Sequence, residues 1–188
     1  LYAMTYLNWI WYADFEKYFT NKVGDIKFKK LTWQAHVAFW FGKIGFIVIA
    51  CVIPIVMFGF LKALVGFIIT AFTCGILLAL VFQAAHVVED TSFLSGDDKK
   101  TEDEWAVTQL NGTANFSTKN PLALFLTGGL NHQIEHHLFP RISHVHYPEI
   151  SKIVRSTAKE FGYQYHEYKT FFAAVASHYS HLRAMGVA

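Results

Sequence analysis

The chain has 188 residues, of which 53% are hydrophobic and 17% aromatic, and its formal net charge at pH 7 is only +2. A charge this close to zero argues against a nucleic-acid partner, whose phosphates select for a strongly basic surface. The two cysteines, Cys51 and Cys74, lie inside apolar stretches and form neither a CxxC metal pair nor a disulfide framework.

The first half of the chain contains two long apolar segments. Residues 46–58 are uncharged, and extension back to Val37 adds one charge, Lys43, which could snorkel toward a membrane boundary. Residues 63–85 carry no charge at all. Each segment can cross a hydrocarbon core of about 30 Å, which needs about 20 residues. We therefore expect a transmembrane helical hairpin over about 37–86, kinked at Pro54. A buried hairpin in a soluble core is the alternative, disfavoured because the second segment has no polar face.

Basic residues predict which side of a membrane the ends of the hairpin would face. They gather before and after it, at Lys17, Lys22, Lys27, Lys29, Lys30, Lys99, Lys100 and Arg141, whereas the turn carries Lys62 alone. The positive-inside rule places both flanks in the cytoplasm. Residues from about 87 to 188 are therefore expected to form a cytoplasmic cap.

A histidine stands at the cytoplasmic mouth of the second apolar segment. His86 could be a metal ligand there, although a lone histidine at such a place is more often an interfacial polar residue. Glu89, three positions on, shares its side of a helix and could orient the imidazole.

The segment after His86 is polar and acidic, and we expect an exposed loop over residues 91–103. Trp105 and Gln109 follow with i,i+4 spacing on an expected short helix, and Asn115 lies in a turn-rich stretch. These side chains could line a substrate entrance or donate hydrogen bonds to metal ligands. Ordinary loop structure is an equal alternative from the residues alone.

The run over residues 131–140 concentrates side chains that bind metals. It holds an asparagine, three imidazoles, a carboxamide and a carboxylate: Asn131, His132, Gln133, Glu135, His136 and His137. Neutral imidazole is the commonest nitrogen ligand and suits iron, copper and zinc. A polar helix end with solvated histidines is the alternative for the shorter QxxHH pattern.

The expected helical geometry of this run favours two metal ions over one. An asparagine before Pro121 predicts a capped helix start, and Pro140 must end the helix. At roughly 100° per residue, Gln133 falls between His136 and His137 in angle, and these two histidines point about 100° apart. Two neighbouring ions, each bound by one of them, would fit better than a single closed site.

Two more helices are expected toward the C-terminus. Tyr147-Pro148 should open one that Gly162 closes, and residues 168–185 should form the last, with Phe172 facing inward. Two histidines, His144 and His146, stand just before the first of these helices. We expect them to have interface or capping roles.

The chain resembles the C-terminal half of a membrane fatty acid desaturase. The resemblance rests on residues 131–140, the segment 86–89, the Trp105/Gln109/Asn115 pattern and the stretch 144–148. Gln133, in place of histidine at the start of the box, is similar to the front-end acyl-lipid or acyl-CoA subfamily. The resemblance spans nearly the whole chain. It implies an all-α integral membrane fold, in which residues 1–188 are the C-terminal part of a desaturase domain.

The resemblance also implies two iron ions on the cytoplasmic face. The third histidine box would be Gln133, His136 and His137, and His86 would be an extra ligand. Supporting residues would be Glu89, Asn131, His132 and Glu135, and the substrate channel would involve Trp105, Gln109 and Asn115. The chain contains no HxxxH or HxxHH upstream, and its only earlier histidine is His36. The N-terminal part with the first two boxes is therefore expected to be missing, and the polypeptide alone to be inactive.

The function implied is oxygen-dependent introduction of a double bond into a fatty acyl chain, carried by a lipid or by coenzyme A. Removing hydrogen from an unactivated methylene needs an oxidant stronger than any side chain, which explains the irons. Electrons would come from a separate carrier, such as a small haem cytochrome or a ferredoxin. The expected location is the endoplasmic reticulum in a eukaryote or the inner membrane in a bacterium.

Two kinds of alternative remain. An acyl hydroxylase or a sphingolipid desaturase could use the same scaffold and the same box. A non-enzymatic metal-binding membrane protein belongs to a different class, and it would bind zinc or no metal and would not need oxygen.

Overall fold

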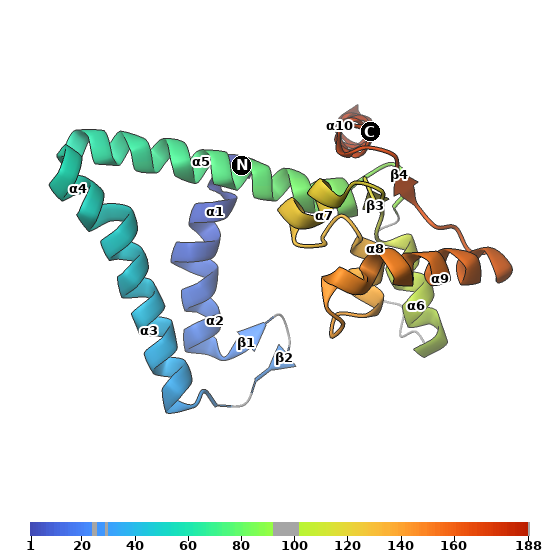
Figure 1. Cartoon of the computed structure of the whole chain (residues 1–188), viewed down its shortest axis with the longest axis horizontal. Coiled ribbons are helices and arrows are strands. Elements are labelled where there is room, and N and C mark those ends of the chain that lie inside the picture. The colour runs from blue at the N-terminus through green and yellow to red at the C-terminus, as the bar shows by residue number, and fades with distance from the viewer. Residues whose placement is uncertain (24–25, 29, 92–101, 188) are drawn as a thin grey trace. The chain divides into compact units, whose positions relative to one another are not determined.

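The computed structural model describes residues 1–23, 26–28, 30–91 and 102–187 (Figure 1). Its contacts divide the chain into two compact units, Leu1–Ala79 and Leu80–Ala188. Most of the acidic loop expected over residues 91–103 lies outside the described residues.

The first unit begins with a continuous helical run. Its parts are a 3-10 turn (Tyr2–Met4), α1 (Thr5–Asn8), a π turn (Trp9–Ala13) and α2 (Asp14–Thr20). The run ends at Asn21, whose φ of 51° is left-handed. Strands β1 (Lys22–Val23) and β2 (Ile26–Lys27) then pair antiparallel.

Two long apolar helical runs follow, as the sequence predicts. Their parts are α3 (Trp33–Ile47), a π turn (Val48–Val52), α4 (Ile53–Phe58) and, after Gly59, α5 (Phe60–His86). Both runs are long and apolar enough to cross a membrane by length and composition. The first helix begins at Trp33, earlier than predicted, because the Thr32 side chain accepts a hydrogen bond from the Ala35 backbone N–H (3.4 Å) and caps it.

Pro54 distorts the first apolar run as expected. A proline has no N–H to donate to the carbonyl four residues before it, so a regular α-helix cannot pass through it undisturbed. The turn before Pro54 is wider than an α turn, and the Ile53 N–H donates to the carbonyl of Val48. A π turn therefore precedes the proline, and π turns are one of the usual causes of a helix kink.

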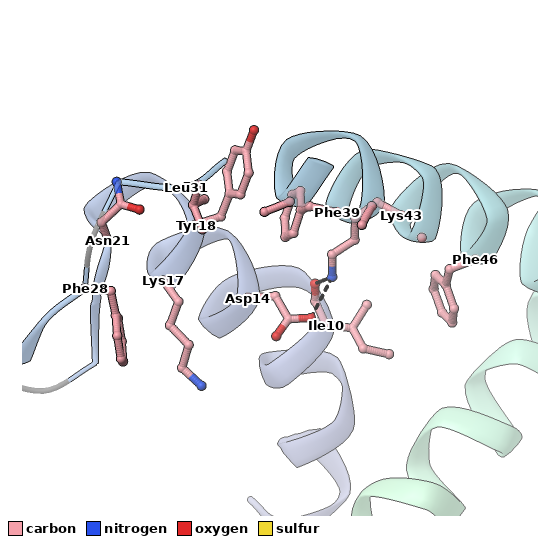
Figure 2. A pocket seen from close by; sticks show the side chains of 13 residues that line it. Ile10, Asp14, Lys17, Tyr18, Asn21, Phe28, Leu31, Phe39, Lys43 and Phe46 are labelled. Carbon is pink, nitrogen blue, oxygen red and sulfur yellow. Dashed lines mark hydrogen bonds and ion pairs between the residues drawn. The ribbon is translucent and has the colours of Figure 1, made fainter. Parts of the chain in front are cut away.

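Lys43, the one charge of the first apolar segment, forms contacts within the first unit. Its Nζ donates to the Ile10 carbonyl oxygen (2.6 Å) and to Asp14 Oδ2 (2.8 Å). The ammonium also lies 5.1 Å and 5.6 Å from the ring centroids of Phe15 and Phe39. Figure 2 shows Lys43 and Asp14 directed toward each other beside a cavity of about 610 Å³ between α2 and α3. An ion pair therefore joins these helices.

Replacement of Lys43 by methionine is expected to lower the stability of the protein. The change leaves the Asp14 carboxylate without its cation, and because Asp14 is about half exposed the cost should be about 1 kcal/mol rather than that of a fully buried pair. Thermal unfolding in detergent measures the effect. Lys62→Met, at an exposed position, is the control, and equal melting temperatures for the two variants would contradict the prediction.

The second unit begins with the last turns of α5 and continues with a series of shorter helices. They are α6 (Glu102–Asn111), α7 (Pro121–Thr127), α8 (Gln133–Leu138), a 3-10 turn (His144–His146), α9 (Tyr147–Glu160) and α10 (Phe171–Val187). One cluster of buried side chains joins Ala84, Ala85, Phe116 and Ala174, and another joins Leu110, Ile134, Val154 and Ala158. These two clusters hold the end of α5 and the inner face of α8 in the same unit.

The described residues are mostly helical, as predicted, but they also contain short strands that the sequence did not predict. Strands β3 (Asn115–Phe116) and β4 (Glu167–Tyr168) pair in parallel, and together with β1 and β2 they give the described residues four short strands. Parallel pairing joins segments that are about 50 residues apart, which a local sequence pattern does not reveal. The prediction that Phe172 faces inward is wrong, since its side chain is 81% exposed.

The long helix suggested before Pro140 is divided into two. Asn120 caps α7 as predicted, accepting hydrogen bonds from the N–H groups of Leu122 (2.9 Å) and Ala123 (3.3 Å). The helix then ends at Gly128, and both Gly128 (φ 58°) and Gly129 (φ 84°) have positive φ. Consequently α8, which carries the histidine box, is a separate helix of only six residues.

Candidate functional site

His86 and Gln133 meet at the end of α5. The Gln133 amide Nε2 donates to His86 Nε2 at 2.9 Å, although the residues are far apart in sequence. The backbone of Gly112 also contacts the imidazole. The backbone hydrogen bond from Ala114 N to Ala85 O (2.8 Å) brings the segment after α6 against this end of α5.

His137 lies next to His86, with 5.0 Å between the ring centroids. Its Nδ1–H donates to Gln109 Oε1 at 2.8 Å, so Nε2 keeps the free lone pair. Burial, with smaller contributions from His86 and His136, lowers the pKa of His137 to about 4. The ring is therefore neutral at pH 7, which is the form that binds a metal ion.

His136 completes the group of imidazoles. Its ring centroid lies 5.8 Å from that of His137, and the two planes are inclined by 78°. Its Nδ1 lies 3.3 Å from the hydroxyl of Tyr147, at the first turn of α9. In His86, His136 and His137 alike, one side of the ring contacts a protein group. Such support is what metal-binding histidines usually have.

The donor set fits iron in its chemistry. Three imidazoles and one carboxamide offer nitrogen and oxygen ligands, and imidazole suits iron. Within the described ranges, no group of three or more His, Cys, Asp or Glu side chains is drawn together closely enough to hold a metal ion. The histidines are therefore neighbours with the right donors rather than a closed coordination cage.

Behind the box lies a buried polar network. Glu135 is completely buried, and its carboxylate accepts hydrogen bonds from Asn115 Nδ2 (2.7 Å) and from the Tyr165 hydroxyl (2.8 Å). His132 is 1% exposed, and its Nδ1 lies 3.7 Å from Glu135 Oε2. Neither ring nitrogen of His132 has a hydrogen-bond partner among the described residues. Asn131 is buried as well, and its Nδ2 donates to the Ser117 carbonyl (3.4 Å).

Comparison with known proteins identifies the family. The family model described as "Fatty acid desaturase" matches residues 1–169. The chain belongs to the fatty acid desaturase family. This agrees with the resemblance stated from the box and its flanking motifs.

Desaturase relatives cover the chain well, but the chain covers only part of them. The "sn-1 linoleoyl-lipid 6-desaturase" of Synechocystis sp. is 47% identical over 68% of this chain and 36% of its own length. The "Acyl-lipid (8-3)-desaturase" of Physcomitrium patens is 38% identical over 100% of this chain and 39% of its own length. The linoleoyl-lipid 6-desaturase of Arthrospira platensis is 36% identical over 90% of this chain and 46% of its own length. The chain thus spans less than half of these relatives, and no solved structure matches it.

The predicted supporting residues of the site lie in different places in the structure. Glu89 was expected to orient His86, but α5 ends at His86 and the Glu89 carboxylate accepts a hydrogen bond from Ser177 (3.2 Å). Asn115 was expected at a substrate entrance or beside the ligands, and it is fully buried under α8. Gln109 contacts His137, whereas Trp105 on the same helix is 48% exposed.

Two tyrosines contact residues of the site, and neither contact was predicted from the sequence. Tyr147 was expected only as the start of a helix, and its hydroxyl lies beside His136. Tyr165 lies in a segment without regular structure, 30 residues after Glu135, and its hydroxyl reaches that carboxylate. Burial, and Glu135 after it, raises the pKa of Tyr165, so the hydroxyl stays protonated and can donate.

Proposed function

We propose that this chain supplies the third histidine box and one further ligand of a membrane di-iron fatty acid desaturase. His86, Gln133, His136 and His137 would hold iron, and the irons when bound would supply the activated oxygen that removes hydrogen from an acyl chain. The observation that carries the proposal is the gathering of these four side chains at the junction of α5, α6 and α8. Asn131, His132 and Glu135 would support them indirectly, whereas Glu89 contacts Ser177 instead.

Four donors cannot fill the coordination spheres of two irons, each of which takes up to six ligands. The remaining ligands would come from the rest of the desaturase, since the chain spans 36–46% of the relatives described. We therefore infer that the 188-residue polypeptide alone does not catalyse desaturation, whereas the complete protein does.

The apolar helices suit a substrate with a long acyl tail. We infer that the runs Trp33–Phe58 and Phe60–His86 cross the membrane and that the site faces the cytoplasm, in the endoplasmic reticulum of a eukaryote or the inner membrane of a bacterium. The named substrate class of the relatives, acyl lipids, makes a lipid-linked acyl chain the first choice over acyl-CoA. Oxygen and a small haem cytochrome or ferredoxin would complete the reaction.

Gln109 is expected to tune iron affinity through His137. Its Oε1 accepts the Nδ1–H of His137, and loss of such a partner typically weakens metal binding roughly 10–100-fold. Gln109→Leu in the full-length desaturase should therefore weaken iron binding by that factor, measured by competition with a chelator. Trp105→Leu, on the same helix but exposed, is the control. Equal affinities for both variants would contradict this role.

The proposed function is tested by expressing the full-length protein in a host that lacks the corresponding product. Feeding defined fatty acids and analysing the lipids by gas chromatography–mass spectrometry should reveal a new double bond that requires oxygen. Purified protein should contain two irons. A hydroxylated product would support the sister oxygenase instead. Zinc or no metal, without any oxygen-dependent product, would indicate a non-enzymatic membrane protein.

A further inference from the structure

We propose that Asn115 and Tyr165 are positioning residues that fix the orientation of the histidine box by clamping the buried carboxylate of Glu135. Neither residue touches the proposed ligands. The consequence for iron binding rests on the proposed function, whereas the clamp itself is a property of the metal-free protein.

The box helix needs an external clamp because it is too short to hold itself. α8 has six residues, and isolated helices shorter than about 12–15 residues are marginal in water. Its direction must therefore come from the contacts of the face opposite the ligands. That face presents Ile134 and Glu135, both with no exposed surface.

Both oxygens of Glu135 are engaged. Asn115 Nδ2 donates to Oε2 at 2.7 Å, and the Tyr165 hydroxyl donates to Oε1 at 2.8 Å. Hydrogen bonds to an ionised group are stronger than those between neutral groups. A carboxylate held at both oxygens has little freedom to rotate, and neither has the short helix that carries it.

Asn115 uses its whole carboxamide in this clamp. Its Oδ1 accepts the backbone N–H of Ile134 at 2.9 Å, and this is one of the N–H groups that the first turn of a helix cannot satisfy internally. Its Nδ2 also donates to the Tyr165 hydroxyl at 2.7 Å. Because Asn115 lies in β3, which pairs with β4, the start of α8 is tied to the only parallel strand pair in the described part of the chain.

Tyr165 is itself held in place from the opposite side. The Arg155 guanidinium lies 5.0 Å from the centroid of its ring, and Arg155 also forms an ion pair with Glu167 of β4. The hydroxyl has one proton and donates it to Glu135, while it accepts from Asn115. The clamp is thus a closed triangle of three side chains from three segments.

Loosening this triangle should move the ligands without removing any of them. His136 and His137 directly follow Glu135, so rotation or fraying of α8 changes the direction of both imidazoles at once. Tyr165→Phe removes one hydroxyl and preserves the ring that packs under Arg155. Tyr163→Phe is the matched control, because Tyr163 is two residues away and 47% exposed.

The test uses the full-length desaturase in detergent. Amide hydrogen exchange over residues 133–138 of the metal-free protein should be about tenfold or more faster in Tyr165→Phe than in the wild type or Tyr163→Phe. In the iron-loaded protein, the same variant should bind iron at least tenfold more weakly. Unchanged exchange in Tyr165→Phe would overturn the clamp. If Tyr165→Phe exchanges faster but the full-length wild-type protein binds no iron, the clamp is supported and the proposed metal function is refuted.

A double-mutant cycle separates the clamp from simple packing of the ring. Glu135→Gln keeps the shape of the side chain but replaces one carboxylate oxygen by an amide nitrogen. Asn115 and Tyr165, which both donate to the carboxylate, then share a single acceptor oxygen. If Tyr165 acts through Glu135, the effect of Tyr165→Phe on exchange should be several-fold smaller in the Glu135→Gln background. An equal effect in both backgrounds would mean that Tyr165 acts by its own packing and would overturn the proposal.

Discussion

Replacement of His136 or His137 by alanine is expected to reduce desaturation by the full-length enzyme to background and to lower its bound iron. Each imidazole would supply one of only four donor side chains that this chain is proposed to offer to the irons, so its loss removes a large share of the site. The neutral state of His137 at pH 7, caused mainly by burial, is the state in which its nitrogen can bind a metal. Product is measured in cell lipids and iron by elemental analysis of the purified protein.

A histidine outside the site provides the control for these variants. His146 is exposed in the turn before α9, so His146→Ala should keep both iron and product. His178 is unsuitable because it is buried, with its Nδ1 2.6 Å from the carbonyl oxygen of Val87. Normal product and iron content in His136→Ala would refute its assignment as a ligand.

The local rules of the sequence predicted most helices of this chain. The cap at Asn120, the opening of α9 at Tyr147-Pro148 and the distortion at Pro54 each depend on one or two adjacent residues. The two apolar helices follow from composition alone. These features were predictable because their causes lie within a few residues of one another.

The supporting side chains of the site were less predictable because their partners are distant in sequence. Gln109 and His137 are 28 residues apart, and Asn115 and Tyr165 are 50 residues apart. Asparagine is typical of turns, yet the β3–β4 pairing buries Asn115 beneath α8. Only the packing of the unit decides whether such an amide meets water, a ligand or a carboxylate.

The two adjacent glycines between α7 and α8 look alike in the sequence, but they differ in their surroundings. A Cβ at Gly128 would meet no atom within 4 Å. A Cβ at Gly129 would lie 2.3 Å from Cβ of His144. Both have positive φ, so both require glycine for conformation, but only Gly129 also requires it for space.

Gly129→Ala is therefore expected to be far more damaging than Gly128→Ala. A left-handed backbone costs a non-glycine residue about 1–2 kcal/mol, and overpacking adds roughly 1–3 kcal/mol at Gly129 alone. We expect a loss of roughly 3 kcal/mol of unfolding free energy for Gly129→Ala and about 1 kcal/mol for Gly128→Ala, measured by denaturant unfolding in detergent.

The same pair of variants links the stability of this turn to the site. The Gly129 carbonyl accepts the backbone N–H of His132 at 2.9 Å, immediately before the box helix, so displacement of Gly129 shifts the start of α8. Iron content should therefore fall in Gly129→Ala at temperatures where the protein is still folded, and it should be retained in Gly128→Ala. If the two variants lost stability and iron equally, the contact with His144 would have no special role, and the left-handed backbone alone would account for both glycines.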